Sequence, residues 1–180
     1  MPVKITKEDE LLLEKYGRAV SKRSNHLIYG NAVLISLIPI WLFWRVHSLT
    51  LVSNAVLYTI VSVASALLMS YAYNSSKTPL MERIASRRTD AITKEVNSVY
   101  GKDKKLSRKD RDDAIRERTT EVADYESTTF AIFYNNCLFL LVLLVTSLVL
   151  SQFSPQLNYF VSMLLAGGSA AFLSSGKSSI

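Results

Sequence analysis

The sequence predicts an all-α membrane protein with four transmembrane helices and a cytosolic antiparallel helical hairpin between the second and third spans. Asp, Glu, Lys and Arg are absent from residues 24–44, 46–76 and 127–176, which leaves uncharged runs of 21, 31 and 50 residues. A bilayer core about 30 Å thick needs roughly 20 apolar residues as helix. The last run is long enough for two spans, and Ser154-Pro155 divides it.

These runs place the spans near residues 27–44, 49–73, 130–153 and 157–175. The predicted organisation is an N-terminal amphipathic segment (1–26), spans one and two (27–73), the hairpin (74–129), spans three and four (130–176) and a short tail (177–180). The N-terminal segment is charged throughout and lacks the apolar stretch of a signal peptide. Leu12, Tyr16 and Ala19 share a helical face, which predicts a short amphipathic helix ahead of the first span.

The distribution of basic residues predicts the orientation. Residues 1–26 hold six Lys and Arg, residues 74–129 hold thirteen, and Lys177 lies in the tail. The connection after the first span has only Arg45, and the connection around Pro155 has none. Because basic loops stay in the cytosol, both termini and the hairpin are expected there. An aromatic belt at the far interface is predicted for Trp41, Phe43 and Trp44.

The central segment reads as two helices joined by a turn. Gly101 interrupts the first helix, and Ser107, with Asp110 three residues later, is a start signal for the second. That second helix meets no breaker before the third span, and Pro79 allows a bend at the base of the hairpin. The apolar positions at helical spacing are Leu80, Ile84, Ala91, Ile92, Val96 and Val99 in the first helix, and Ala114, Ile115, Val122 and Thr129 in the second.

Signatures of catalysis are missing from the sequence. It has no nucleophile with a base in register, no metal-ligand spacing and no glycine-rich phosphate loop, so we expect a protein that is not an enzyme and needs no cofactor or metal. The expected spans contain no ionisable residue, which argues against a transporter or channel. Cys137 is the one cysteine and is expected to be a buried, inert thiol.

Polar and small residues inside the spans are interpreted as positions for packing or docking. An asparagine in hydrocarbon finds a hydrogen-bond partner on another helix, and glycine permits close helix approach. These contacts would form within the bundle or with another membrane subunit. The candidates are Asn31, Asn54, Asn135, Asn136, Gly167 and Gly168.

Basic residues are concentrated at the turn of the hairpin, where residues 102–111 carry a net charge of +4. Lys and Arg without interleaved aromatic residues suit phosphate contacts that are indifferent to sequence and sensitive to salt. A solvated run of charges is the plain alternative. A projecting turn is too far from the bilayer for lipid attraction, so a ribosome beside the membrane is the favoured polyanion. The candidates are Lys102, Lys104, Lys105, Arg108, Lys109 and Arg111, with Arg116 and Arg118 as weaker ones.

Three segments resemble the gamma subunit family of the translocon-associated protein complex, also called the signal sequence receptor gamma subunit: GNAVLISLIPIWLFWRV (30–46), LSRKDRDDAIRER (106–118) and EVADYESTTFAIFYNN (121–136). The resemblance implies a non-enzymatic protein of the endoplasmic reticulum membrane that assembles with alpha, beta and delta subunits beside the Sec61 channel. It also implies a cytosolic helical domain that contacts rRNA and protein of the large ribosomal subunit, a bundle surrounded by membrane lipid, and assistance to cotranslational translocation.

A second reading of the same features is a tetraspan membrane scaffold whose cytosolic hairpin binds a protein partner. The two readings predict different effects of nuclease on the association with ribosomes. Trimming exposed rRNA should weaken an association that rRNA mediates and leave one with a protein partner unchanged.

Overall fold

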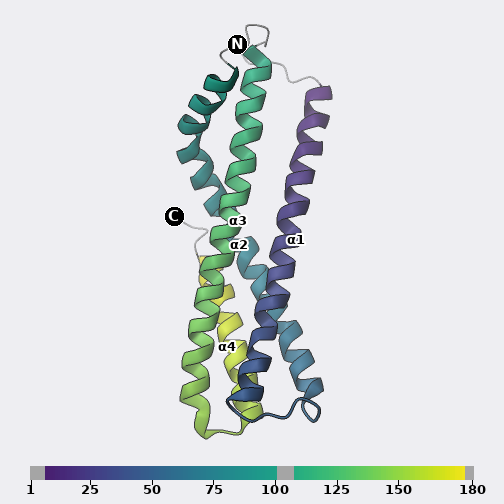
Figure 1. Ribbon diagram of the computed structural model, residues 1–180, viewed down its shortest axis with the longest axis vertical. Helices are drawn as coiled ribbons and strands as arrows, with labels where there is room; N and C mark the ends of the chain where they lie inside the picture. Colours follow the sequence, from purple (N-terminus) through teal and green to yellow (C-terminus); the bar gives the residue numbers. More distant parts are fainter. Residues whose placement is uncertain (1–6, 101–107, 177–180) are drawn as a thin grey trace. The chain divides into compact units, whose positions relative to one another are not determined.

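The computed structural model describes the backbone of residues 7–100 and 108–176, and the side chains of residues 24–98, 109 and 111–176. The described residues form helices and no strand, which confirms the predicted all-α class (Figure 1). The elements are α1 (Lys7–Arg45), α2 (Ala55–Tyr100), α3 (Arg108–Val149), the 3₁₀ turn η1 (Leu150–Gln152) and α4 (Pro155–Ser175). Within these residues, four helical stretches are long and apolar enough to cross a membrane: Ser24–Arg45, Ala55–Ser98, Arg111–Gln152 and Pro155–Ser175.

The chain divides into two compact units. The charged unit consists of Met1–His26 and Leu80–Ser127, and the apolar unit consists of Leu27–Pro79 and Thr128–Ile180. Helices α1, α2 and α3 each contribute a stretch to both units, whereas α4 belongs to the apolar unit alone. The boundaries of the apolar unit lie close to the ends of the three uncharged runs.

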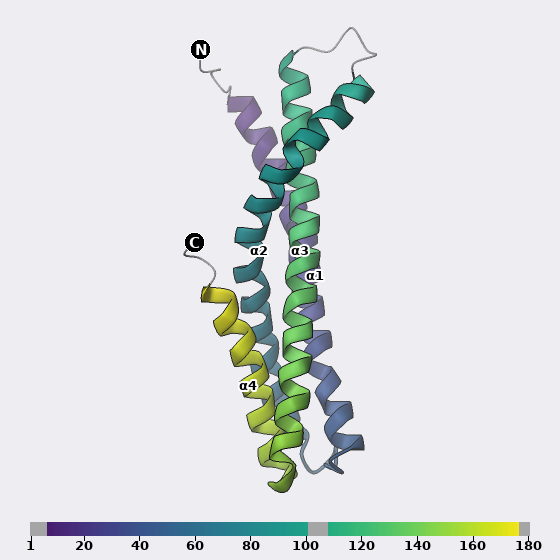
Figure 2. The ribbon, with the colours of Figure 1, turned by 90° about the vertical axis from the view of Figure 1, so that its left-hand side faces the viewer.

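The apolar unit is a bundle of four helices with a packed interior and an apolar exterior. Figure 2 shows α4 lying alongside α2 and α3 in this unit. Its buried side chains include Ile28, Met69, Phe139, Leu143 and Met163. Many large apolar side chains point outward, among them Val56, Leu67, Leu148 and Phe172. Apolar groups on both sides are what a bundle in lipid requires, since helix packing there does not depend on excluding water.

The first two helices have different bounds from those predicted. The predicted N-terminal helix and first span form one continuous helix, α1, because no proline lies between residues 3 and 38 to break it. The sequence predicts a second span from residue 49, whereas α2 begins at Ala55. Ser48 has a φ of 55°, and the Leu49 N–H donates to the Phe43 carbonyl at 3.1 Å, so the chain turns before α2 can start.

The later helices agree more closely with the sequence. Helix α3 runs without a break from the charged unit into the apolar unit, as predicted. It ends at Val149, and η1 leads to Ser154 and Pro155, where α4 begins two residues earlier than predicted. Proline suits this first helical position, because its missing N–H would have no partner there. Helix α2 remains helical on both sides of Pro79.

In the charged unit, α2 and α3 pack as the antiparallel pair that the sequence predicts. The Arg88 guanidinium donates to Glu126 through Nη2 at 2.9 Å and Nε at 3.3 Å. Ile92 and Val96 of α2 and Ala123 of α3 are buried in the same unit. The ion pair shows the register of the two helices, and because its Arg side chain is 53% exposed, solvent screening keeps its contribution to stability small.

Two positions of the predicted apolar stripes are wrong. Ala91 and Thr129 are exposed, because each lies one residue beside the buried line that contains Ile92 and Thr128. Leu80, Ile84, Ala114, Ile115 and Val122 are half-buried, in accord with the stripes. The predicted turn at Gly101, the Ser107 start signal and the Val99 side chain lie outside the described residues.

Candidate functional sites

The basic turn consists of Lys102, Lys104, Lys105, Arg108, Lys109 and Arg111. Lys102, Lys104 and Lys105 lie outside the described residues, and Arg108 opens α3. Lys109 and Arg111 are exposed on the first turn of that helix. The described part of the basic turn is therefore carried by the start of α3, where the helix holds the two side chains on different faces.

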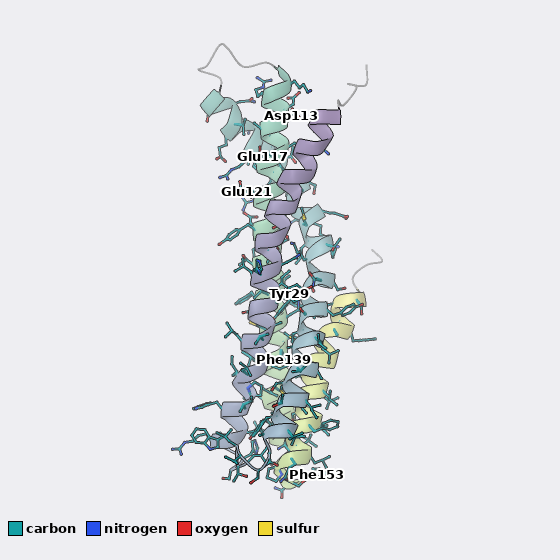
Figure 3. All side chains as sticks on the ribbon, turned by 90° about the vertical axis from the view of Figure 1, so that its right-hand side faces the viewer. Tyr29, Asp113, Glu117, Glu121, Phe139 and Phe153 are labelled. Atoms are coloured by element: carbon teal, nitrogen blue, oxygen red, sulfur yellow. The ribbon has the colours of Figure 1, made fainter. Side chains whose placement is uncertain are left out.

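The weaker candidates, Arg116 and Arg118, are also exposed on α3 but lie among acidic residues. Arg118 Nη1 donates to Glu121 Oε2 at 2.8 Å. Asp113, Glu117 and Glu121 follow one another at four-residue spacing along α3, as Figure 3 shows. We call these three residues the acidic stripe. Because side chains four apart share a helical face, this part of α3 presents carboxylates between its arginines.

The acidic stripe changes the electrostatic picture of the hairpin. The net positive charge falls along α3 from Arg111 to Arg118, because the stripe adds carboxylates there and Glu121 is paired with Arg118. The stripe as a set was not predicted, although the four-residue spacing of Asp113, Glu117 and Glu121 is visible in the sequence.

Within the apolar unit, Asn31 of α1, Tyr73 of α2 and Asn136 of α3 form a hydrogen-bonded triad. Asn31 Nδ2 donates to the Tyr73 hydroxyl at 2.9 Å and to Asn136 Oδ1 at 3.2 Å, and the Tyr73 hydroxyl also donates to Asn136 Oδ1. Tyr73 is completely buried. Each residue of the triad therefore bonds to residues on the two other helices, which is favourable for polar side chains in a low-dielectric interior.

A second polar cluster joins the other face of α3 to α2 and α4. Asn135 Nδ2 donates to Ser76 Oγ at 3.1 Å and to the Ala131 carbonyl at 2.8 Å, and Asn135 Oδ1 accepts from Ser174 Oγ at 2.8 Å. Ser76 Oγ also donates to Ser174 Oγ at 2.9 Å. Asn135 and Ser174 are almost completely buried. The triad and this cluster together form what we call the polar layer, which links all four helices.

Asn31, Asn135 and Asn136 were predicted as packing or docking positions, whereas the side chains that complete the polar layer were not predicted. Tyr73, Ser76 and Ser174 carry no sequence signal that separates them from other hydroxyl residues of the spans. Asn54, by contrast, lies in the connection before α2 and donates to the Thr50 carbonyl at 2.9 Å. Its role is to shape that local turn.

The opposite end of the apolar unit is held by aromatic residues. Phe43 meets Tyr159 edge-on with ring centroids 5.1 Å apart, and Tyr58 meets Tyr159 at 4.9 Å. The Tyr58 hydroxyl donates to the Leu49 carbonyl at 3.2 Å, and the Tyr159 hydroxyl is 3.1 Å from Ser62 Oγ. We call Phe43, Tyr58 and Tyr159 the aromatic clasp.

Two of the single-residue predictions are wrong in burial. Phe43 is completely buried in the aromatic clasp, whereas Trp41 and Trp44 are exposed, so only the two tryptophans have the outward position of an aromatic belt. Cys137 is exposed on the outer surface of α3, because it lies on the same side as Phe133 and away from Asn136 and its partners. Among the described side chains, no group of three His, Cys, Asp or Glu is placed to hold a metal.

The two glycines of α4 have different surroundings. A Cβ added to Gly167 would lie 3.2 Å from Leu68 Cδ1 and 3.5 Å from Ser65 Oγ, both on α2, whereas a Cβ on Gly168 would meet nothing within 4 Å. Gly167 therefore permits the close approach of α2 and α4, and Gly168 does not contribute to it.

We expect Gly167→Leu to lower the free energy of unfolding by about 2 kcal/mol relative to Gly168→Leu. Both changes raise helix propensity equally, by about 1 kcal/mol, so their difference isolates the crowding against α2. The measurement is dodecyl sulfate titration of the full chain in detergent micelles. Equal stability of the two variants would contradict the assigned role of Gly167.

Comparison with known proteins gives concordant matches. The family model described as translocon-associated protein, gamma subunit, matches residues 8–176. The translocon-associated protein subunit gamma of Dictyostelium discoideum is 24% identical over 170 residues, which cover 94% of this chain and 96% of that protein. The match therefore includes the polar layer, the aromatic clasp and the basic turn.

Proposed function

Because the chain belongs to the translocon-associated protein gamma family, we propose that it anchors its complex in the membrane and contacts the translating ribosome beside the Sec61 channel. The family and the four apolar helices indicate a multi-pass protein of the endoplasmic reticulum membrane that is a translocon-associated subunit. The proposal adds that the subunit is not an enzyme and that it assists cotranslational translocation.

The orientation is part of the proposal. Both termini and residues 74–129 would face the cytosol, since nearly all Lys and Arg lie there. Residues 27–73 and 130–176 would span the membrane, with 1–26 and 177–180 on the cytosolic side. The outer apolar surface of the bundle would face lipid, the Sec61 channel and the alpha, beta and delta subunits. Gly168 lies half-buried and open on α4, where a partner helix has room to approach.

The main support for ribosome contact is the concentration of positive charge in the basic turn, far along the chain from the uncharged runs. Lys and Arg neutralise phosphates and release counterions, which makes the binding sensitive to salt. Phosphate contacts position a protein without reading bases, in keeping with the lack of aromatic residues within 102–111. Arg116 and Arg118 would contribute less, because the carboxylates of the acidic stripe are next to them on α3.

The proposal is tested by replacing all six residues of the basic turn with Glu and measuring co-sedimentation with ribosomes. We expect binding at moderate salt to fall at least ~10-fold and the salt dependence to flatten, because each lost phosphate contact lowers the slope by about one. Co-isolation of the other subunits should be unchanged, since the apolar unit is untouched.

The matched control exchanges Lys for Arg and Arg for Lys at the same six positions, which keeps every charge. That variant should bind ribosomes like the parent. Parental co-sedimentation by the Glu variant across a salt titration would overturn the proposal.

The acidic stripe favours one alternative, in which the hairpin of a tetraspan scaffold binds a basic protein surface. Asp113, Glu117 and Glu121 are exposed on one face of α3 and suit such a partner. Under this alternative, trimming exposed rRNA with nuclease leaves the association intact, whereas neutralising the stripe to Asn and Gln abolishes it.

A further inference from the structure

The basic residues of α2 in the charged unit divide into two kinds. Arg83, Arg87, Arg88 and Lys94 are all exposed. Arg88 is occupied by its two hydrogen bonds to Glu126. Among the described residues, the side chains of Arg83, Arg87 and Lys94 form no ion pair. Pairing within the hairpin therefore explains the position of Arg88 but not the positions of the other three basic residues.

These three residues share one face of the helix. Spacings of four and seven residues place Arg83, Arg87 and Lys94 within roughly 40° of each other around the α2 axis. Arg88 lies about 100° from Arg87 on that axis, in the direction of α3. Asp90 occupies the same face between Arg87 and Lys94 and offsets one charge. The part of the face that stays clearly positive is the pair Arg83 and Arg87, which we call the proximal arginine pair.

The proximal arginine pair lies a short length of helix beyond the apolar unit. Lys77 is the first charge after the 31-residue uncharged run, and Arg83 and Arg87 follow it by six and ten residues. At 1.5 Å per residue, these are roughly 9 and 15 Å of helix. The headgroup region is about 5–8 Å thick on each side of the hydrocarbon, and an Arg stem adds reach toward it. With Lys77 at the edge of the hydrocarbon, Arg83 and Arg87 lie roughly 1–4 Å and 7–10 Å of helix beyond the headgroup layer. Both are then within about one Debye length, about 8 Å, of the headgroups.

We propose that the proximal arginine pair binds the phosphate groups of anionic lipids at the membrane surface. A guanidinium presents a planar fork of donors that matches phosphate oxygens in a bidentate manner. Basic segments next to a transmembrane helix attract anionic headgroups for the same electrostatic reason. The pair is separate from the basic turn, which begins fifteen residues later in the chain, after α2 has continued as helix to Tyr100.

The test uses the full chain reconstituted in phosphatidylcholine vesicles that contain a photoactivatable phosphatidylserine. Arg83→Glu with Arg87→Glu is compared with Arg111→Glu with Arg116→Glu, a pair of equal charge change on α3. We expect the proximal variant to lose photolabelling at least ~5-fold, the effect of one basic residue near an anionic surface. The α3 variant should be labelled like the parent.

A photoactivatable phosphatidylcholine serves as the folding control, because it reports insertion without requiring negative charge. It should label all three proteins equally, and Arg83→Lys with Arg87→Lys should retain most phosphatidylserine labelling. Parental phosphatidylserine labelling of the proximal Glu variant, or equal loss in the α3 variant, would overturn the assignment. So would a loss of ribosome co-sedimentation by the proximal variant with lipid labelling intact, which would make this face an RNA contact. Failure of the basic turn to bind ribosomes would leave the lipid assignment unaffected.

Discussion

Phe43→Ala lowers the free energy of unfolding by about 3 kcal/mol, the largest effect we expect of any single substitution in the apolar unit. Phe43 is completely buried and meets Tyr159 edge-on, and the His47 ring stacks on it with centroids 4.6 Å apart. Helix association in lipid depends on van der Waals packing. The cavity left by the smaller side chain therefore removes stabilising contacts between the helices.

The matched control is Trp41→Ala, two residues earlier in α1. Trp41 is 62% exposed, so its loss should change the free energy of unfolding by less than about 1 kcal/mol. The measurement is dodecyl sulfate titration of the full chain, with resistance to protease as the readout. If the two alanine variants are equally stable, Phe43 is not part of a packed clasp.

Phe43 and Trp41 also show how much of the fold can be predicted from the sequence. The uncharged runs predict the number of spans, since they depend only on the cost of placing charge in hydrocarbon. They do not predict which way an aromatic side chain points. Trp41, Phe43 and Trp44 are all aromatic residues near the same end of the first span, so the sequence does not distinguish them. Phe43 differs because the chain turns at Ser48 and folds Leu49 back onto the end of α1. That turn depends on backbone geometry that residue types alone do not specify.

The same limit applies to the polar layer and to the charged unit. Residue type was enough to select Asn31, Asn135 and Asn136, but Asn158 was missed, although it is buried in α4 and donates to the Ser147 carbonyl at 2.9 Å. Serine is common in these helices, and its hydroxyl usually hydrogen-bonds to a backbone carbonyl of the same helix. Ser76 and Ser174 were therefore not predictable. In the hairpin, periodicity predicts two helices, but the choice of Arg88 to pair with Glu126 depends on the register between them.

The second large effect is expected for Asn135→Leu, which should lower the free energy of unfolding by about 2 kcal/mol. Asn135 is completely buried and bonds to Ser76 and Ser174 on two other helices. Interhelical hydrogen bonds in membrane proteins average about 0.6 kcal/mol, and a buried group left without its partner adds about 1–3 kcal/mol. Leucine is tetrahedral at Cγ where the amide carbon is planar, so its two methyl groups need more room between the helices.

A double-mutant cycle separates hydrogen bonding from crowding. Asn135→Ala and Ser174→Ala remove the two partners with little change in volume at the serine, and the double variant reports their coupling. We expect a coupling of about 1 kcal/mol, measured by the same titration. Asn54→Leu is the control, since the Asn54 side chain bonds only to Thr50 in its own connection, so its loss should cost less than the loss of Asn135. Additive effects of the two alanine changes would mean that the polar layer does not hold α3 to α4, and the register of the bundle would then rest on apolar packing alone.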